Sequence, residues 1–152
     1  MNIETKERYI QLVAVQMHAS IDDYKTAQAF KYKIEQVMQK VYSKIERDIP
    51  ALVVFPEDVG TMTALSGMKV KYTYQASLND MIEKIIKKNI IRLAPIKLRY
   101  KMLKNDLSWL RCFFLYRGNF MQKIYVNTFS AMAQKYKVYI VAGSTLLPYY
   151  SY

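Results

Sequence analysis

The run LVVFPE, from Leu52 to Glu57, constrains the fold of this chain more than any other segment. It is apolar and rich in β-branched residues, which favours a buried β-strand, and Pro56 ends the run because proline cannot donate a backbone hydrogen bond. In open α/β sheets, ligands collect beyond the carboxyl ends of the strands, where Glu57 is expected. The pattern therefore predicts a strand that positions an acid or a base. For a lone carboxylate, the alternative is a strand followed by an ordinary polar turn.

The first 66 residues predict a β-α-β unit. Leu12 to Val15 is an uninterrupted apolar segment, as in a parallel strand that is covered on both faces. Ser20 and Asp22 offer side-chain oxygens to cap a following helix, Pro50 ends the connection, and Ala51 to Phe55 returns as a parallel strand. The helix is predicted by one apolar stripe at spacings of three and four residues, namely Ala27, Phe30, Ile34, Val37, Met38, Val41 and Ile45.

Residues 67–119 predict an additional helical segment. An amphipathic pattern near residues 81–90 should be interrupted by Pro95, and helical spacing resumes from Leu98 to Tyr116. Gly118 follows as a predicted C-terminal cap.

A third amphipathic segment runs from about Met121 to Tyr136 and leads into a predicted strand at Val138 to Ala142. No internal repeat and no Gly/Ser-rich linker divides the sequence. We therefore expect a single domain over residues 1–152, with a mixed sheet that carries helices on at least one face.

The positive charge is concentrated in the second half of the chain. Residues 1–66 contain 8 Lys and Arg against 9 Asp and Glu, whereas residues 67–152 contain 15 against 3, which together give the net charge of +11. A basic surface can bind nucleic-acid phosphates or anionic lipid headgroups, but lysines on helices more often form a solvated outer face. We therefore favour a solvated face over a nucleic-acid site.

Composition excludes several other classes of protein. One cysteine cannot form an internal disulfide, and no run approaches the length of a membrane span or has the apolar core of a signal peptide. We therefore expect a cytoplasmic protein without a membrane partner.

Three motifs in order resemble the amino-terminal half of the nitrilase, or carbon–nitrogen hydrolase, family. They are YIQLVAVQM at Tyr9 to Met17, LVVFPE with the following DVG, and KYKVYIVAGSTLLP at residues 135–148. The resemblance covers about residues 9–67 and 120–148. It implies a four-layer αββα sandwich, of which this chain supplies about one sheet with its helices.

The resemblance also implies a Glu-Lys-Cys triad that hydrolyses amides or nitriles. Glu57 matches the position of the general base, which activates the thiol for attack while the lysine stabilises the developing charge. No lysine or cysteine of the chain stands at a matching position, so the sequence contains no predicted nucleophile. Cys112 lies in the apolar context WLRCFFLY and is predicted to be a small buried hydrophobe.

No other residues form a recognisable catalytic, cofactor or metal site. His18 is the only histidine, which excludes a histidine triad or a multi-histidine metal site, and Asp22 with Asp23 is typical of helix capping. The glycines are too scattered for a phosphate-binding loop. We therefore expect neither a cofactor nor a metal.

Two functions remain open. The chain is either the amino-terminal portion of a truncated or split carbon–nitrogen hydrolase, or a non-catalytic basic α/β adaptor, for which nucleic acid is one candidate ligand. In the first case a missing half would complete a site for a small amide or nitrile, and the chain alone would be inactive. Unpaired sheet surface would then favour self-association or a complementary chain.

Overall fold

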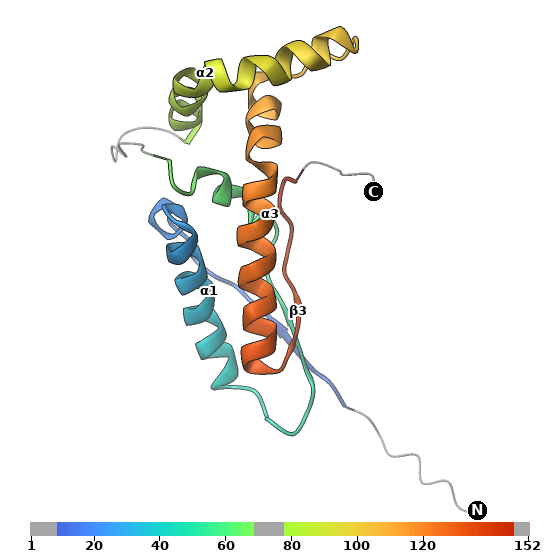
Figure 1. The fold of residues 1–152 in the computed structure, drawn as a ribbon. Helices are drawn as coiled ribbons and strands as arrows, with labels where there is room; N and C mark the ends of the chain where they lie inside the picture. Colours follow the sequence, from blue (N-terminus) through green and yellow to red (C-terminus); the bar gives the residue numbers. More distant parts are fainter. Residues whose placement is uncertain (1–8, 69–77, 148–152) are drawn as a thin grey trace, which may run out of the picture.

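The computed structural model describes residues 9–68 and 78–147 and has an α/β architecture (Figure 1). In chain order its elements are strand β1 (Gln11–Ala14), 3-10 helix η1 (Ile21–Tyr24), helix α1 (Ala27–Tyr42), strand β2 (Ala51–Val54), 3-10 helix η2 (Thr61–Leu65), helices α2 (Leu78–Met102) and α3 (Trp109–Tyr136), and strand β3 (Tyr139–Val141).

The three strands form one sheet in the order β1-β2-β3. Both strand pairs are parallel, so the mixed sheet that we expected is not seen among the described strands. The predicted strands are present, and each is one or two residues shorter than predicted or shifted by one residue. Helices lie between each strand and the next, which provides the long crossover connections that parallel pairing requires.

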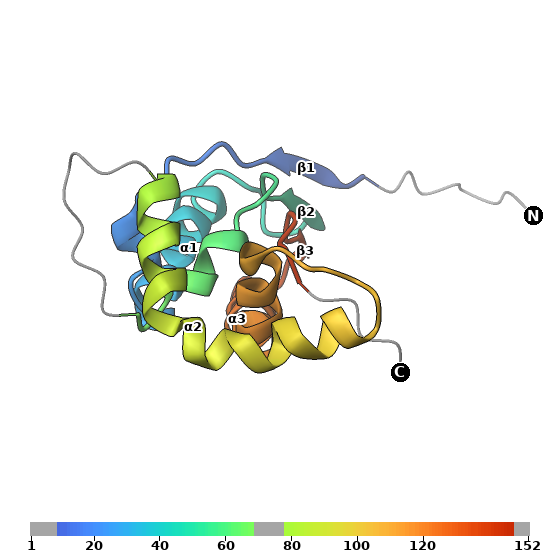
Figure 2. The same ribbon diagram turned by 90° about the horizontal axis from the view of Figure 1, so that it is seen from above.

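Helices α1 and α3 lie on the same face of this sheet (Figures 1 and 2). The apolar stripe predicted for α1 is confirmed, since Phe30, Ile34 and Met38 are almost completely buried. The ring of Phe129 in α3 packs edge-on against two other rings. Its centroid lies 6.2 Å from that of Phe30 and 5.0 Å from that of Phe55. Such pairs add about 0.5–1.5 kcal/mol each to ordinary hydrophobic burial, so they fix both helices against the strands.

The opposite face of the sheet is apolar and open to solvent. The register places Leu12, Leu52 and Tyr139 in one row across the strands, and Ala14, Val54 and Val141 in a second row. Leu12 is 73% exposed and Tyr139 is 67% exposed. The expectation that β1 is covered on both faces is therefore wrong for this chain, since helices cover one face only.

Helix α2 packs across α3 at the end of the molecule away from β1 and forms a second apolar cluster (Figure 1). The cluster joins Ile85 and Leu93 of α2 to Cys112 and Phe113 of α3. Arg117 ties α3 to η2 and to the residue that follows it, because its side chain donates hydrogen bonds to the carbonyl oxygens of Ala64 at 2.9 Å and Ser66 at 2.5 Å.

The additional helical segment differs in three ways from its prediction. Helix α2 continues through Pro95, and the predicted helix from Leu98 to Tyr116 is interrupted between Met102 and Trp109. Gly118 is not a cap but a buried residue inside α3, and the C-terminal cap of α3 is Lys137 in the left-handed conformation. Because α3 runs from Trp109 to Tyr136, the chain has no structural boundary at residue 119. The start of the predicted segment, residues 69–77, lies outside the described residues.

The caps also differ from the prediction. Ser20 precedes η1, whereas α1 begins after Thr26, whose hydroxyl accepts a hydrogen bond from the Ala29 N–H at 3.0 Å. Ser20 and Asp22 therefore do not cap α1. Among the helices that the structure describes, none combines the length and apolar character that crossing a membrane requires.

Candidate functional site

Glu57 lies directly beyond the central strand of the sheet, as its sequence predicts. Strand β2 ends at Val54, Phe55 still donates a backbone hydrogen bond to the Val141 carbonyl at 2.8 Å, and the chain turns at residues 57–60. The Glu57 side chain is exposed at this edge. Within residues 9–68 and 78–147, it makes no hydrogen bond or ion pair.

The turn that carries Glu57 is held by the segment after β3. The next residue, Asp58, has a left-handed backbone with φ of 56°, and its N–H donates to the Ser144 hydroxyl at 2.9 Å. The Asp58 carboxylate accepts a hydrogen bond from the Thr61 hydroxyl at 3.0 Å, and Thr61 accepts one from the Leu146 N–H at 3.2 Å. Side chains and backbone from two distant segments therefore fix the direction in which the chain leaves β2.

Two tyrosines, the buried Tyr24 and the half-buried Tyr125, hold the same turn through their hydroxyl groups. The Tyr125 hydroxyl lies 2.9 Å from the carbonyl oxygens of both Ala142 and Gly143, and the Tyr24 hydroxyl donates to the Val59 carbonyl at 3.1 Å. Burial raises the pKa of both phenols, and the nearby Asp23 carboxylate raises that of Tyr24 further. Both hydroxyls therefore remain protonated donors, which keeps the turn and the β3 exit in one fixed arrangement.

This arrangement can supply a base, but it contains no activated nucleophile. An exposed carboxylate on a fixed turn can accept a proton from a group placed beside it. Among the described residues, no hydroxyl or thiol makes a hydrogen bond to the Glu57 carboxylate, and the Ser144 hydroxyl accepts the Asp58 N–H instead. The site therefore needs a thiol or hydroxyl from elsewhere before it can attack a carbonyl or nitrile carbon.

Cys112 cannot provide that nucleophile. Its side chain is completely buried in the cluster formed with α2, whereas Glu57 is exposed at the sheet edge. Burial raises the pKa of the Cys112 thiol, which lowers the fraction present as reactive thiolate. The prediction of a buried cysteine is confirmed, and its lack of reactivity remains a prediction.

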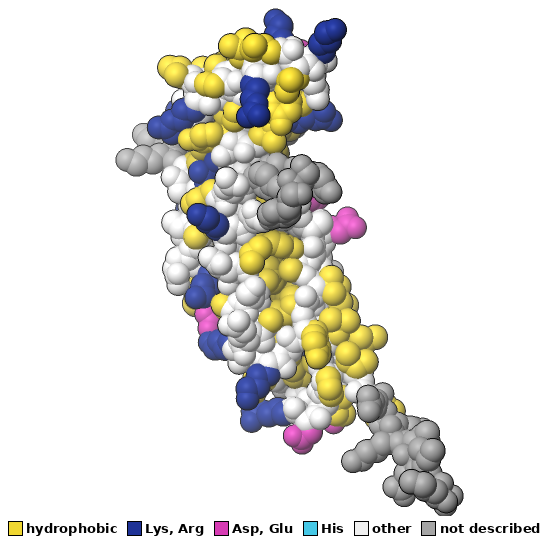
Figure 3. All heavy atoms as spheres, turned by 45° about the vertical axis from the view of Figure 1, so that its right-hand side comes forward, with side chains coloured by type: hydrophobic (Ala, Val, Ile, Leu, Met, Phe, Trp, Pro, Cys, Tyr) yellow, Lys and Arg dark blue, Asp and Glu magenta, His cyan; other side chains and the backbone are white. Residues whose placement is uncertain are grey.

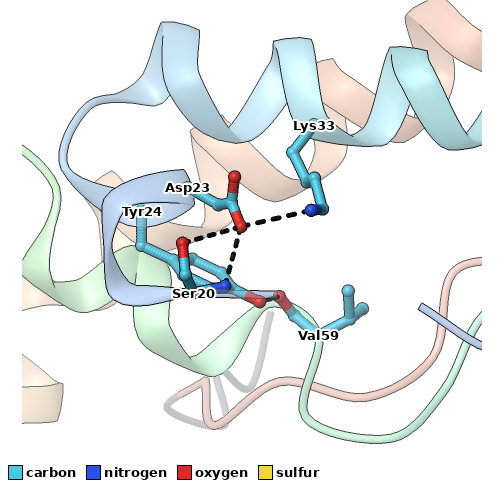
Figure 4. A network of polar contacts seen from close by, with 5 residues as sticks. All are labelled: Ser20, Asp23, Tyr24, Lys33 and Val59. Atoms are coloured by element: carbon cyan, nitrogen blue, oxygen red, sulfur yellow. Dashed lines mark hydrogen bonds and ion pairs between the residues drawn. The ribbon is translucent and has the colours of Figure 1, made fainter. Parts of the chain in front are cut away.

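The acidic pair after β1 has a structural position. The Asp23 carboxylate accepts hydrogen bonds from the N–H of Ser20 at 2.7 Å and its hydroxyl at 3.1 Å, and lies 3.4 Å from the Lys33 ammonium (Figure 4). Burial tends to raise the pKa of Asp23, but the Ser20 hydrogen bonds and the Lys33 charge together lower it. Asp22 pairs with Lys25 at 2.6 Å, so the two carboxylates do not form a catalytic pair.

A hollow of about 770 Å³ lies between β1 and α1, away from Glu57. Its walls include the exposed His18 and the lysines Lys33, Lys40 and Lys44. Within the part of the chain that the structure describes, no three His, Cys, Asp or Glu side chains gather closely enough to hold a metal ion.

Sequence reasoning found Glu57 but missed the residues that position it. Asp58, Thr61 and Ser144 meet only because β2 and β3 are neighbours, and their separation along the chain is as much as 86 residues. The one local signal was the Gly143-Ser144 pair directly after a predicted strand.

The chain shows no significant match to any protein-family model, to any curated protein or to any solved structure.

Proposed function

We propose that this chain is the amino-terminal portion of a carbon–nitrogen hydrolase, with Glu57 as its general base, and that it is inactive without the residues that supply the lysine and the cysteine. The observation that carries the proposal is the one-sided sheet. Its central strand leads to Glu57, α1 and α3 cover one face, and the other face presents two rows of apolar side chains.

The open face supports the proposal because parallel sheets are normally buried on both faces. Leu12, Val54 and Tyr139 would gain stability if a second sheet packed on them, at about 25 cal/mol for each Å² of apolar surface removed from water. A four-layer αββα sandwich provides such a second sheet. Figure 3 shows hydrophobic side chains gathered over the lower part of the molecule, where the strands lie.

The chemistry of Glu57 supports the role of a base that acts on a group from outside the chain. A neutral thiol loses its proton to a carboxylate as it attacks the carbonyl or nitrile carbon, and a lysine ammonium stabilises the negative oxygen or nitrogen that forms. General-base assistance is worth about 10²–10⁴ in rate, whereas loss of a nucleophile can cost on the order of 10⁶. The chain by itself should therefore release no ammonia from amides or nitriles above a heat-denatured control.

The test begins with the DNA downstream of the coding sequence. The proposal expects it to encode, in the same or a neighbouring frame, a polypeptide with the lysine and cysteine motifs. Co-expression of the two polypeptides should give ammonia release from at least one member of a panel of amides and nitriles. Glu57→Gln should remove that activity and leave the complex intact, while Glu46→Gln, a matched change at another exposed carboxylate, should not.

Two outcomes would contradict the proposal. One is the absence of a downstream polypeptide with these motifs. The other is a reconstituted complex whose turnover is unchanged by Glu57→Gln, since the base would then lie elsewhere.

A further inference from the structure

We propose that the outward face of the carboxyl-terminal half of α2 binds to an anionic lipid surface, with the helix lying parallel to the plane of the membrane. Three aliphatic side chains form this face, which we call the outer stripe: Ile91, Leu98 and Met102. They are 87%, 60% and 77% exposed, which is unusual for three large apolar residues on one helix.

The outer stripe follows from the helical spacing. Its members are separated by seven and then four residues, so they lie along one side of the helix over about 17 Å at a rise of about 1.5 Å per residue. The other side of α2 is already occupied, since Met81, Ile85 and Leu93 are buried. Helix α2 thus has two apolar faces, of which one stabilises the fold and the other has no partner within the described chain.

Cationic side chains surround the outer stripe. Residues 78–102 contain seven Lys and Arg but only Asp80 and Glu83 as acids, a net charge of +5. Lys88, Arg92, Arg99 and Lys101 are exposed beside the outer stripe. The upper end of the molecule in Figure 3 accordingly shows hydrophobic side chains with Lys and Arg interspersed. A surface of this kind is complementary to acyl chains beneath a layer of negative headgroups.

The shape of the molecule leaves the outer stripe accessible to a flat surface. Helix α2 crosses the end of α3 and extends beyond it, on the outside of the molecule in both views (Figures 1 and 2). The apolar face of the sheet lies elsewhere, so membrane contact through α2 would not compete with a partner on the sheet. This binding requires no helix that spans the membrane.

The outer stripe favours a lipid surface over nucleic acid. Proteins that bind single-stranded nucleic acid combine cations with aromatic side chains that stack on the bases. The outer stripe is aliphatic instead, and insertion below the headgroups is the step that would remove its three side chains from water.

The experiment uses the full chain and two kinds of vesicle in a flotation assay. One is pure phosphatidylcholine, and the other contains about one-third phosphatidylserine, which gives the negative surface potential that attracts Lys and Arg. We expect the protein to float with the anionic vesicles only, and to be released as sodium chloride is raised, since salt screens the attraction.

Paired variants separate the two contributions. Leu98→Gln/Met102→Gln should weaken binding about tenfold or more, because two inserted apolar groups are lost. Lys88→Gln/Arg92→Gln should weaken it about 25-fold, at about fivefold for each cation. Leu12→Gln/Tyr139→Gln on the sheet and Lys40→Gln/Lys44→Gln, at and just after the carboxyl-terminal end of α1, are matched controls at exposed positions and should bind like the wild type.

Circular dichroism would establish that each variant is folded. Failure to float with anionic vesicles at low salt would overturn the proposal. Equal loss of binding in the α1 control pair would overturn it too, because the attraction would then reflect net charge and not α2. Retention on single-stranded RNA with no vesicle binding would assign the cations to nucleic acid instead.

Discussion

A Cβ atom added to Gly143 would lie 2.0 Å from the carbonyl oxygen of Pro56. The exit of β3 therefore passes so close to the exit of β2 that only glycine fits, and Gly143 also has a φ of +75°, which side chains rarely adopt. This approach brings Ser144 within hydrogen-bonding distance of Asp58, beside Glu57. The position of the candidate base thus depends on a glycine 86 residues later in the chain.

Gly143→Ala should destabilise the protein by about 2–4 kcal/mol. The left-handed conformation costs about 1–2 kcal/mol for a residue with a Cβ, and displacement of the Pro56 backbone adds a similar amount. For a chain of this size, thermal unfolding should shift down by roughly 4–16 °C, measured by circular dichroism.

Gly67→Ala is the matched control for this prediction. Gly67 has the same φ of +75°, but an added Cβ there would meet no atom of the described residues within 4 Å apart from its chain neighbours. The free energy of unfolding of Gly67→Ala should therefore fall only by the cost of the left-handed conformation, about 1–2 kcal/mol. Equal losses in the two variants would show that the contact with Pro56 is not tight.

Cys112 should react slowly with thiol reagents in the native protein and rapidly in denaturant. It is fully buried, and burial raises its pKa, so both access and thiolate fraction are low. Labelling rates with a chromogenic disulfide, measured with and without urea, test this directly. Fast labelling of the folded chain would mean that an active thiol had been dismissed.

Replacement of Cys112 should distinguish packing from chemistry. Cys112→Ser should lower the free energy of unfolding more than Cys112→Ala, because it places a hydroxyl without a partner in an apolar cluster at about 1–3 kcal/mol. If serine were the better-tolerated residue, the site would be more polar than its neighbours Leu93 and Phe113 indicate.

Local patterns predicted the sheet and α1 because these elements depend on short-range periodicity. The stripe of Phe30, Ile34 and Met38 has one buried side, and the run ending at Phe55 fits one strand whose helix-covered face is buried. The carboxyl-terminal position of Glu57 followed from that strand alone. By contrast, the contact of Asp58 with Ser144 depends on which strands pair, which no local pattern specifies.

The errors in the helical segment have a tertiary cause. Pro95 has no backbone N–H, so the carbonyl of Ile91, four residues earlier in α2, loses its helical hydrogen bond. Ile91 is exposed, so water can bind this carbonyl instead. Packing of Leu93 against α3 then supports the helix through the proline. Gly118 inside α3 lowers the stability of the helix by about 1 kcal/mol relative to alanine. Burial of the nearby Phe113 and Met121 contributes more than this, so the helix continues through Gly118.

Asp23 should make the stability of the protein depend on pH in acid. Its pKa is lowered in the folded state, so its contribution is fully present above the pKa of about 3.9 in the unfolded chain, and is lost as pH falls through the lower folded value. Asp23→Asn should therefore be less stable than the wild type at pH 7, and the gap should close below about pH 4.

Urea unfolding at pH 7, 5, 4 and 3 would test the Asp23 prediction, with Asp48→Asn as a control for loss of one exposed negative charge. A gap between wild type and Asp23→Asn that stayed constant down to pH 3 would exclude the Ser20 and Lys33 contacts as its cause (Figure 4).

The isolated chain should self-associate through the open face of its sheet. Leu12, Val54, Tyr139 and Val141 are all exposed on one side of three parallel strands, and both β1 and β3 are edges of the described sheet. Exposed apolar patches and unpaired strand edges favour association, while the net charge of +11 opposes it more strongly at low salt. Light scattering should therefore detect dimers or larger species, and their fraction should rise with protein concentration and with salt.

Leu12→Lys/Tyr139→Lys should shift this equilibrium to the monomer, because it adds charge to both outer strands of the face without touching the buried core. Leu98→Gln/Met102→Gln removes a comparable exposed apolar surface from α2 and should leave the association unchanged. If the α2 variant became monomeric and the sheet variant did not, the outer stripe of α2 would be the surface that joins the copies. A wild-type chain that stayed monomeric at high concentration and high salt would show that the open face is stable in water, and the need for a second sheet would lose its physical basis.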